Sequence, residues 1–471
     1  MEKTSFNRAT LPEIVRYSFG GLGSNIPFQL ILMYLTFYYT DVIHINPAAV
    51  GVLFLISKAI DALASVLVGM LSDRTKSKLG KFRPWIIYGA PVLGITIFLL
   101  FFVPSGLSDS AKLVYVYATF IIYSFASASV NIPYHSLTPV LTDDPDQRTT
   151  VTMAKQLQGV FAGLLVTAVA LPLVSIFGGG STGWTLLALI YGAIVTVSFW
   201  ICASGAKRKD NPEKLIVKEN KVKEKVTVGK QLSLIGKNLP LVLLLIAFGF
   251  DNAAMALSNA ANMYFFNYNL GKVNLVAVMG LVQTVVTVPI SFAVPALAKK
   301  FGKKNLMLWG YVLATVPLLL LHVVSYSNAY VVISLFVASA AIFQVTNICG
   351  WAALADCVEY GEWKTGLRGE GTVTSSLTFI NKVGNALGGM LTGVILASVG
   401  YVAGKAQPDI VLEAIKHMRV TAPIIAYIIS IVAMYFYVID NKFFAKMMSD
   451  LAERREKSKV TESDDSTSTQ A

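Results

Sequence analysis

Charged residues are scarce in this chain of 471 residues. Asp, Glu, Lys and Arg together make up 14% of it, whereas 55% of the residues are hydrophobic and the mean hydropathy is +0.61. Ordinary soluble domains carry about 25% charged residues. The scarcity excludes such a domain and indicates an integral membrane protein.

Cysteine is also rare, and the motifs of several enzyme classes are missing. The three cysteines, Cys202, Cys349 and Cys357, lie in or at the ends of apolar runs without paired spacing, which argues against a disulfide framework or a zinc site. The sequence contains no HExxH and no GxxxxGK[ST]. We therefore expect no enzyme activity, no metal site and no cofactor.

Long apolar runs are abundant. About twelve of them approach or exceed the roughly 20 residues that cross a bilayer as a helix, and they are continuous rather than alternating, which argues against a barrel. The sequence therefore predicts an all-α membrane protein with twelve transmembrane helices. The expected spans are 12–43, 48–72, 84–104, 111–137, 152–176, 182–203, 238–267, 273–298, 304–325, 329–355, 372–401 and 418–445.

Basic residues fall in alternate loops, above all after the second and eighth spans and between Lys207 and Lys237. By the positive-inside rule, both termini and the central loop are cytoplasmic. The formal net charge of +12 is then a topology signal, and no nucleic-acid partner is expected. We read no removable signal peptide at the N-terminus, and we expect a multi-pass protein of a prokaryotic plasma membrane.

One long polar segment separates the first six apolar spans from the last six. We predict an N-terminal six-helix bundle (1–205), a cytoplasmic central loop (206–237), a C-terminal six-helix bundle (238–447) and a cytoplasmic tail (448–471) that is disordered after a helical start. GKFRPWIIYG after the second span is echoed by GKKNLMLWGYV after the eighth. Two related halves with a site near the bilayer midplane are typical of secondary transporters, which we expect to work as monomers.

An aspartate in the second span, LISKAIDALASVLVGMLSDR, is the best candidate for a coupling site. An ionisable residue inside a spanning helix costs several kcal/mol unless it faces a cavity or a partner. Lys58, Asp61 and Ser65 share one helix face and form the predicted cation-coupling set. The alternative is that Lys58 and Asp61 are only a neutralising packing pair.

Polar residues in other spans predict the substrate site. Asn-x-Pro occurs in span 1 and again in NIPYHSL of span 4, where Asn, Tyr and His would offer hydrogen bonds and a stacking surface to a polar ring. Hydrogen bonding between helices is the alternative for the two asparagines. The pattern predicts Asn25, Asn131, Tyr134 and His135 as substrate-binding residues. Lys155 and Lys382 are further cations within the apolar spans, for which snorkelling to a membrane face is the alternative.

Two further groups of charged residues remain. Asp251 is a second intramembrane carboxylate, for which the sequence leaves coupling and structural roles open. An ion-pair network that closes a cytoplasmic gate is expected from a second set, with a solvated interfacial loop as the alternative. This set comprises Asp73, Arg74, Asp356, Glu359, Glu362 and Arg368.

Several of these motifs together resemble the glycoside–pentoside–hexuronide cation symporters of the major facilitator superfamily. They are FYYTDV (37–42), DALAS with DRTKSKLGKFRPW, NIPYHSL, and ADCVEYGEWKTGLRGEG (355–371). The resemblance covers nearly the whole chain. It implies that Asp61 matches the family's principal cation-site aspartate. It also implies that Lys382 lies where the cation and sugar sites meet and belongs to both predicted sets, and we expect Lys155 and Thr378 among the substrate-binding residues.

The departures from that family pattern concern both sites. The second cation-site carboxylate is replaced by Ser65 and a threonine ligand by Ala128, so we favour H⁺ over Na⁺ as the coupling ion. Two sugar-binding aspartates are replaced by Asn25 and Asn131. The remaining lysines then favour an anionic sugar, unless Asp61 and Asp251 neutralise them and leave a site for a neutral glycoside or pentoside.

The sequence therefore predicts a secondary active transporter that imports a glycoside, pentoside or hexuronide by cation symport with alternating access. An uncoupled sugar facilitator and a Na⁺-coupled symporter are the alternatives within the same family. A membrane sensor that does not transport is the alternative from another class. Besides the sugar, the expected partner is the lipid bilayer.

Overall fold

The structure, a computed structural model, describes residues 8–142, 145–210, 235–366 and 369–468, and these residues contain helices and no strands. Arg368 and most of the predicted central loop lie outside the described residues. The predicted all-α class is confirmed.

All twelve predicted spans are helical. The first half contains α1 (Leu11–Leu30), α2 (Pro47–Arg74), α3 (Arg83–Leu100), α4 (Asp109–Leu141), α5 (Pro145–Leu164), α6 (Ala170–Ile176) and α7 (Gly180–Gly205). The second half contains α10 (Leu239–Tyr264), α11 (Leu275–Phe301), α12 (Lys303–Leu320), α13 (Ala329–Thr365), α14 (Glu370–Ser398), α15 (Asp409–Lys416), α16 (Ala422–Tyr435) and α17 (Asn441–Ser468). Five π-helical turns continue or join these helices: η1 (Ile31–Leu35), η2 (Tyr38–Val42), η3 (Leu165–Val169), η4 (Phe265–Asn269) and η5 (His417–Thr421).

Among the described residues, 10 helical segments are long and apolar enough to cross a membrane. The two predicted spans outside this group correspond to α1 and α12. Polar residues explain the difference: α1 carries Glu13, Arg16 and an Asn, and the 18-residue α12 starts with two lysines. Each predicted span therefore contains a helix, and two of the spans are more polar than the rest. The last predicted span, 418–445, is interrupted by non-helical residues between Tyr435 and Asn441.

The chain forms two compact units. Unit 1 comprises Met1–Lys223, Ala256–Thr284 and Ala386–Arg419, and unit 2 comprises Glu224–Met255, Val285–Asn385 and Val420–Ala471. The boundaries pass through α10, α11 and α14. Parts of the second half of the sequence are thus packed with the first half inside unit 1.

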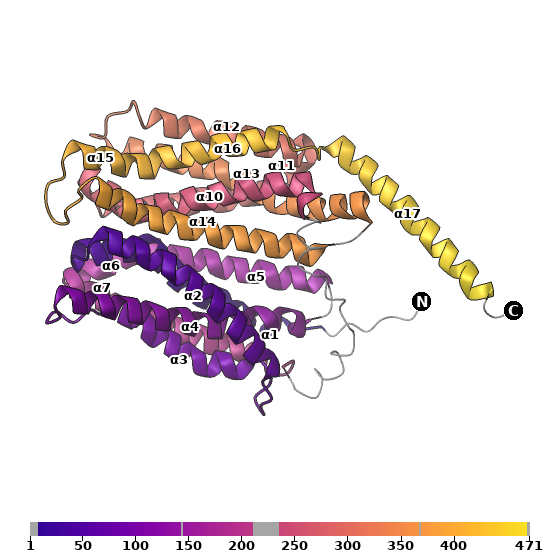
Figure 1. Ribbon diagram of the computed structural model, residues 1–471, viewed down its shortest axis with the longest axis horizontal. Helices are drawn as coiled ribbons and strands as arrows, with labels where there is room; N and C mark the ends of the chain where they lie inside the picture. Colours follow the sequence, from indigo (N-terminus) through magenta and orange to yellow (C-terminus); the bar gives the residue numbers. More distant parts are fainter. Residues whose placement is uncertain (1–7, 143–144, 211–234, 367–368, 469–471) are drawn as a thin grey trace. The chain divides into compact units, whose positions relative to one another are not determined.

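Close helix packing in unit 1 depends on small residues. α1 packs against α5 and α7, α3 packs against α4 and α7, and α2 packs against α4, so these helices run alongside one another (Figure 1). A Cβ at Gly192 of α7 would lie only 2.5 Å from the Gly94 carbonyl oxygen of α3. Such contacts let helices approach closely where lipid provides no hydrophobic driving force for their association.

In unit 2, α12 packs against α13 and α16, and α17 packs against the end of α13. The Trp363 indole donates to the Asp450 carboxylate at 3.0 Å, and the Arg454 guanidinium donates to the Trp363 carbonyl oxygen at 2.7 Å. Both bonds tie α17, the yellow helix of Figure 1, to α13. The segment predicted as a tail with a helical start is helical to Ser468.

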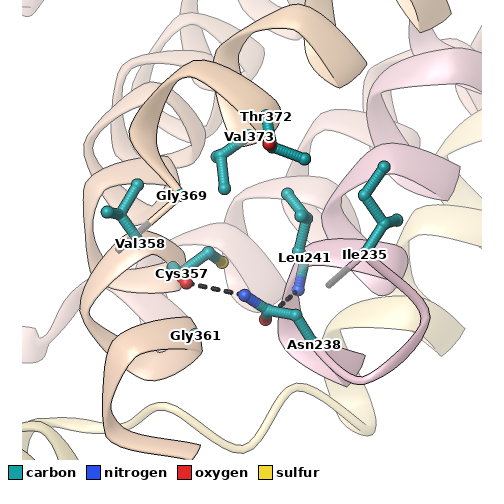
Figure 2. A pocket seen from close by; sticks show the side chains of 9 residues that line it. All are labelled: Ile235, Asn238, Leu241, Cys357, Val358, Gly361, Gly369, Thr372 and Val373. Carbon is teal, nitrogen blue, oxygen red and sulfur yellow. Dashed lines mark hydrogen bonds between the residues drawn. The ribbon is translucent and has the colours of Figure 1, made fainter. Parts of the chain in front are cut away.

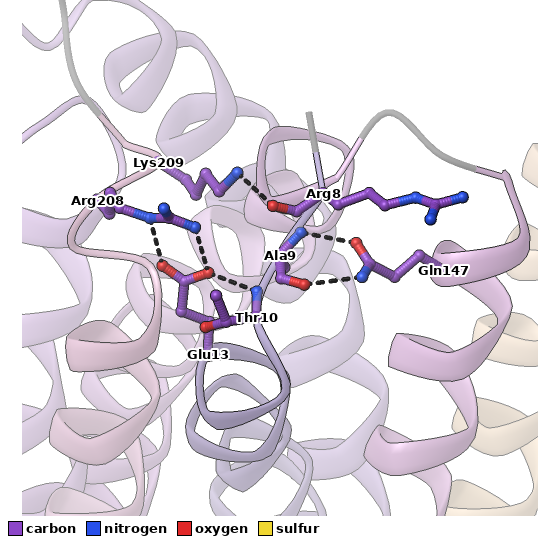
Figure 3. Close-up of polar contacts among 7 residues, drawn as sticks. All are labelled: Arg8, Ala9, Thr10, Glu13, Gln147, Arg208 and Lys209. Atoms are coloured by element: carbon purple, nitrogen blue, oxygen red, sulfur yellow. Dashed lines mark hydrogen bonds and ion pairs between the residues drawn. The ribbon is translucent and has the colours of Figure 1, made fainter. Parts of the chain in front are cut away.

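The start of α1 is fixed by polar contacts from α5 and from the residues after α7 (Figure 3). The Arg208 guanidinium donates to both Glu13 carboxylate oxygens, at 2.8 and 3.0 Å. The Gln147 side chain makes two hydrogen bonds of 2.7 Å with the Ala9 backbone, and Lys209 donates to the Arg8 carbonyl oxygen. The termini of three helices in unit 1 are thereby joined.

Asp210, just after α7, caps α3 from outside that helix. One carboxylate oxygen accepts the Phe82 and Arg83 backbone N–H groups at 2.9 and 2.8 Å, and the other accepts the Lys81 N–H at 3.0 Å. The first N–H groups of a helix have no partner within it and favour a negative charge. The 2%-exposed Asp210 therefore anchors the basic loop between α2 and α3.

We predict that Asp210→Ala loosens this basic loop, because three backbone donors lose their acceptor. A lost buried hydrogen bond costs about 1–3 kcal/mol, so trypsin cleavage after Lys76, Lys78 and Lys81 should accelerate roughly tenfold or more. Mass spectrometry of the fragments measures the rate at each site. Asp109→Ala, which removes an exposed carboxylate, is the control, and equal cleavage in both variants would contradict the capping role.

Candidate functional site

The predicted cation-coupling residues of span 2 lie along α2 in unit 1. Asp61 and Ser65 are half-buried, and the Ser65 hydroxyl donates to the Asp61 backbone carbonyl oxygen at 2.7 Å. Lys58 is part of the helix, and its side chain lies outside the description. Ala64 and Val68 of α2 pack with Ala128 of α4 in one apolar cluster. The side of α2 that carries Ala64 and Val68 therefore packs against α4 through apolar groups.

The two Asn-x-Pro segments meet within unit 1. The Ser24 hydroxyl of α1 donates to the Asn131 side-chain oxygen of α4 at 2.6 Å, and the Asn131 amide donates to Ser127. The Asn25 amide donates to the Gly21 carbonyl oxygen at 2.8 Å. Both asparagines are half-buried, and the bond between Ser24 and Asn131 joins span 1 to span 4, as the alternative of hydrogen bonding between helices requires.

Lys155 of α5 is held by aromatic rings rather than by a recorded ion pair. Its ammonium lies 4.5 Å from the Tyr134 ring centroid and 5.7 Å from that of Tyr17, and donates to the Thr138 hydroxyl at 3.2 Å. Cation–π contacts of this kind stabilise a lysine in a desolvated setting. Tyr134 is 1% exposed and forms the wall behind Lys155, whereas its neighbour His135 is exposed.

The predicted residues of the second half lie on α14 in unit 2. Lys382 and Thr378 are exposed, and the Thr378 hydroxyl donates to the Thr374 carbonyl oxygen of the preceding turn at 2.9 Å. Three asparagines of the same unit, Asn381 and Asn385 on α14 and Asn252 on α10, are bonded to one another. The sequence analysis singled out none of the three.

Asp251 of α10 is buried within unit 2, with 4% of its surface exposed. Its two carboxylate oxygens accept hydrogen bonds from the Tyr311 hydroxyl at 2.6 Å and the Ser430 hydroxyl at 3.1 Å. These partners come from α12 and α16, so the aspartate joins three helices. Among the described residues, this carboxylate is satisfied by hydroxyl donors and forms no ion pair.

The predicted cytoplasmic gate residues are only partly brought together. Asp356 of α13 forms an ion pair with Lys303 of α12 at 2.7 Å, and this pair lies wholly in unit 2. Glu359 and Glu362 are half-exposed on the next turns of α13. In unit 1, Arg74 is exposed at the end of α2, and the Asp73 side chain lies outside the description.

A small pocket lies where α10 begins, beside α13 and α14 in unit 2 (Figure 2). Asn238 borders it, donating to the Cys357 carbonyl oxygen at 2.7 Å and accepting the Leu241 N–H at 3.1 Å. Leu241, Val358 and Val373 make most of the remaining lining apolar. Its polar groups satisfy one another, so the pocket suits helix packing better than sugar recognition.

A polar cluster that the sequence analysis missed surrounds Asp41, at the end of the π-helical continuation of α1. Its carboxylate accepts hydrogen bonds from the hydroxyls of Tyr268, at 2.5 Å, and of Tyr401, and from Thr40 at 2.7 Å. Thr40 is also bonded to the Tyr264 hydroxyl at 2.6 Å. All five residues belong to unit 1. FYYTDV contains Asp41, but its tyrosine partners lie more than 200 residues away in the sequence.

Backbone contacts accompany this cluster in unit 1. A Cβ at Gly51 of α2 would lie 2.8 Å from the Met390 carbonyl oxygen of α14, and one at Gly280 of α11 would lie 2.6 Å from Thr167. First-half helices thus touch second-half helices at the ends remote from the N-terminus.

Comparison with known proteins agrees with the geometry. Residues 16–441 match the family model described as MFS/sugar transport protein. An isoprimeverose transporter of Lactiplantibacillus pentosus is 35% identical over 95% of this chain and 92% of its own, and a glucuronide carrier protein homolog of Escherichia coli is 30% identical over 94% and 95%. The crystal structure of the nucleoside transporter NupG superposes with a TM-score of 0.62 at 12% identity, covering 93% of this chain and 99% of that one.

Proposed function

Because this chain belongs to the MFS/sugar transport protein family and is a multi-pass sugar transporter, we propose that it imports a glycoside, pentoside or hexuronide by proton symport with alternating access. The predicted resemblance to the glycoside–pentoside–hexuronide symporters is confirmed by the family match and by these relatives. We further propose that it works as a single chain in a prokaryotic plasma membrane, with both termini in the cytoplasm.

The surroundings of Asp61 support a proton as the coupling ion. Sodium binding requires several oxygen ligands, whereas a proton requires one titrating group. The Ser65 hydroxyl already donates to its own helix, and Ala128 contributes only a methyl group to the apolar cluster beside α2. Asp61 is therefore the proposed proton carrier, and its change of charge is coupled to sugar binding.

The polar groups of α1, α4 and α5 support a sugar site in unit 1. Asn25 and Asn131 supply amides, and Lys155 supplies a positive charge 4.5 Å from the Tyr134 ring centroid. Among the residues that the structure describes, no carboxylate forms an ion pair with Lys155, and such a lysine favours an anionic sugar. The relatives are named for isoprimeverose and for a glucuronide, so the assay should contain both a neutral and an anionic sugar.

Uptake into proteoliposomes tests the function. We expect labelled sugar from a panel of isoprimeverose, methyl β-xyloside and methyl β-glucuronide to accumulate under an imposed pH gradient and not under a Na⁺ gradient. Accumulation driven by the Na⁺ gradient would show that the coupling ion is Na⁺ and not H⁺. Equilibration without accumulation would indicate a facilitator, and absence of flux for all sugars would contradict sugar transport by this protein.

Asp61→Asn should abolish accumulation under the pH gradient while sugar exchange continues, because the amide no longer binds a proton. Asp251→Asn is the matched control, since its one remaining oxygen can accept from one of the hydroxyls of Tyr311 and Ser430, and its amide nitrogen can donate to the other. We expect this control to retain accumulation. Undiminished uphill uptake by Asp61→Asn would remove Asp61 from the coupling mechanism.

The Asp41 cluster supports alternating access. Opening the transporter on this face requires the first-half residue Asp41 to separate from Tyr268 and Tyr401 of the second half. Hydrogen bonds to an ionised carboxylate contribute about 1.5–3 kcal/mol each. The cluster is therefore a latch that favours the conformation closed on this face, and the rocking of two halves would break and remake it.

Removing the latch should shift the population toward a conformation open on the face of Asp41. In a variant with Asn25→Cys, Tyr268→Phe together with Tyr401→Phe should raise the rate of labelling by an impermeant maleimide from that face roughly tenfold. The native cysteines are buried, which keeps the background low. Tyr330→Phe, an exposed tyrosine, is the control. Unchanged labelling would show that the cluster does not control opening.

A further inference from the structure

Three asparagines form one hydrogen-bonded group between α10 and α14 in unit 2. A Cβ at Gly384 of α14 would lie 2.7 Å from the Gly249 carbonyl oxygen and 3.0 Å from the Asn252 Cβ, so the two helices are in close contact here. Asn381 and Asn385 flank this glycine on α14. Three amides in otherwise apolar helices need an explanation, because each amide is costly in hydrocarbon unless it is satisfied.

The hydrogen bonds of Asn252 fix the orientation of both amides on α14. Its amide nitrogen donates to the Phe248 carbonyl oxygen at 2.8 Å and to the Asn381 side-chain oxygen at 3.0 Å. Its side-chain oxygen lies 3.5 Å from the Asn385 amide nitrogen, which also donates to the Asn381 backbone carbonyl at 2.8 Å. The Asn381 oxygen and the Asn385 nitrogen therefore face inward, toward bonded partners.

The opposite ends of these amides remain available. Within the described residues, the Asn381 amide nitrogen and the Asn385 side-chain oxygen have no recorded partner, and both side chains are half-buried. One is a donor and the other an acceptor, and a spacing of four residues places them on the same helix face. A role in joining helices uses only the inward ends of the two amides. It does not account for the outward donor of Asn381 and the outward acceptor of Asn385, one helical turn apart.

We propose that Asn381 and Asn385 form a subsite for two neighbouring hydroxyl groups of a sugar. The Asn381 amide donates to one hydroxyl oxygen, and the Asn385 oxygen accepts the proton of the next hydroxyl. Asn252 acts as a positioning residue, because it orients both amides without touching the sugar. Thr378 and Lys382 on the same helix extend this polar surface. The inference rests on the proposed sugar transport and assigns part of the recognition to the second half.

A hydroxyl-deletion experiment tests the subsite. Isoprimeverose and its monodeoxy analogues compete for transport in proteoliposomes containing the wild type, Asn381→Ala, Asn385→Ala or Asn252→Ala. For the wild type, loss of either recognised hydroxyl should raise the inhibition constant roughly 3- to 10-fold. Asn385→Ala should abolish the effect of one deletion, and Asn381→Ala that of the neighbouring one. Asn252→Ala should weaken both effects.

Controls separate this inference from packing and from the function itself. Ser339→Ala removes a buried bond between α13 and α12 that has no access to ligand, and it should leave every analogue effect unchanged. Serine variants at positions 381 and 385 replace any alanine variant that does not fold. If the wild type transports isoprimeverose but both α14 variants keep the full effects, the subsite is wrong. If the wild type transports none of the panel sugars, the proposed function fails first.

Discussion

Hydrocarbon offers no hydrogen bonds, and this constraint governs each polar side chain in the helices of this protein. Asp251 accepts from two hydroxyls, Lys155 lies against an aromatic ring, and Asn131 accepts from Ser24. Each partner comes from another helix. These polar groups therefore hold helices together through hydrogen bonds. A polar group that still has an unused donor or acceptor can also bind a ligand or a proton.

The acidic residues differ in the kind of partner that satisfies each carboxylate. Asp210 uses both carboxylate oxygens on backbone N–H groups, which makes it a structural cap. Asp356 is neutralised by Lys303. Asp41 depends on tyrosine hydroxyls from distant segments of the chain, so a movement of those segments changes its partners directly. A latch requires this last arrangement, because bonds within a single rigid element would not report its motion.

Recognition of a sugar needs both donors and acceptors, and each unit offers them in a different way. Unit 1 contains the amides of Asn25 and Asn131 and the charge of Lys155, to which we assign sugar binding as a proposal. Unit 2 contains Lys382 together with amides whose orientation depends on Asn252. A family that transports varied glycosides can change specificity by exchanging such side chains while the helices stay in place.

The sequence by itself determined the membrane class, the twelve helical spans and most of the candidate polar residues, because hydrophobic length and the cost of a charge in lipid are local properties. Asp61 and Lys382 were identifiable for this reason. Only the tertiary structure decided the partners: Asp210 with the start of α3, Asp41 with Tyr268 and Tyr401, and Asn252 with Asn381. These pairs are separated by more than 100 residues, and which of many polar groups meet depends on the packing of helices, which the spacing of residues along the chain does not encode.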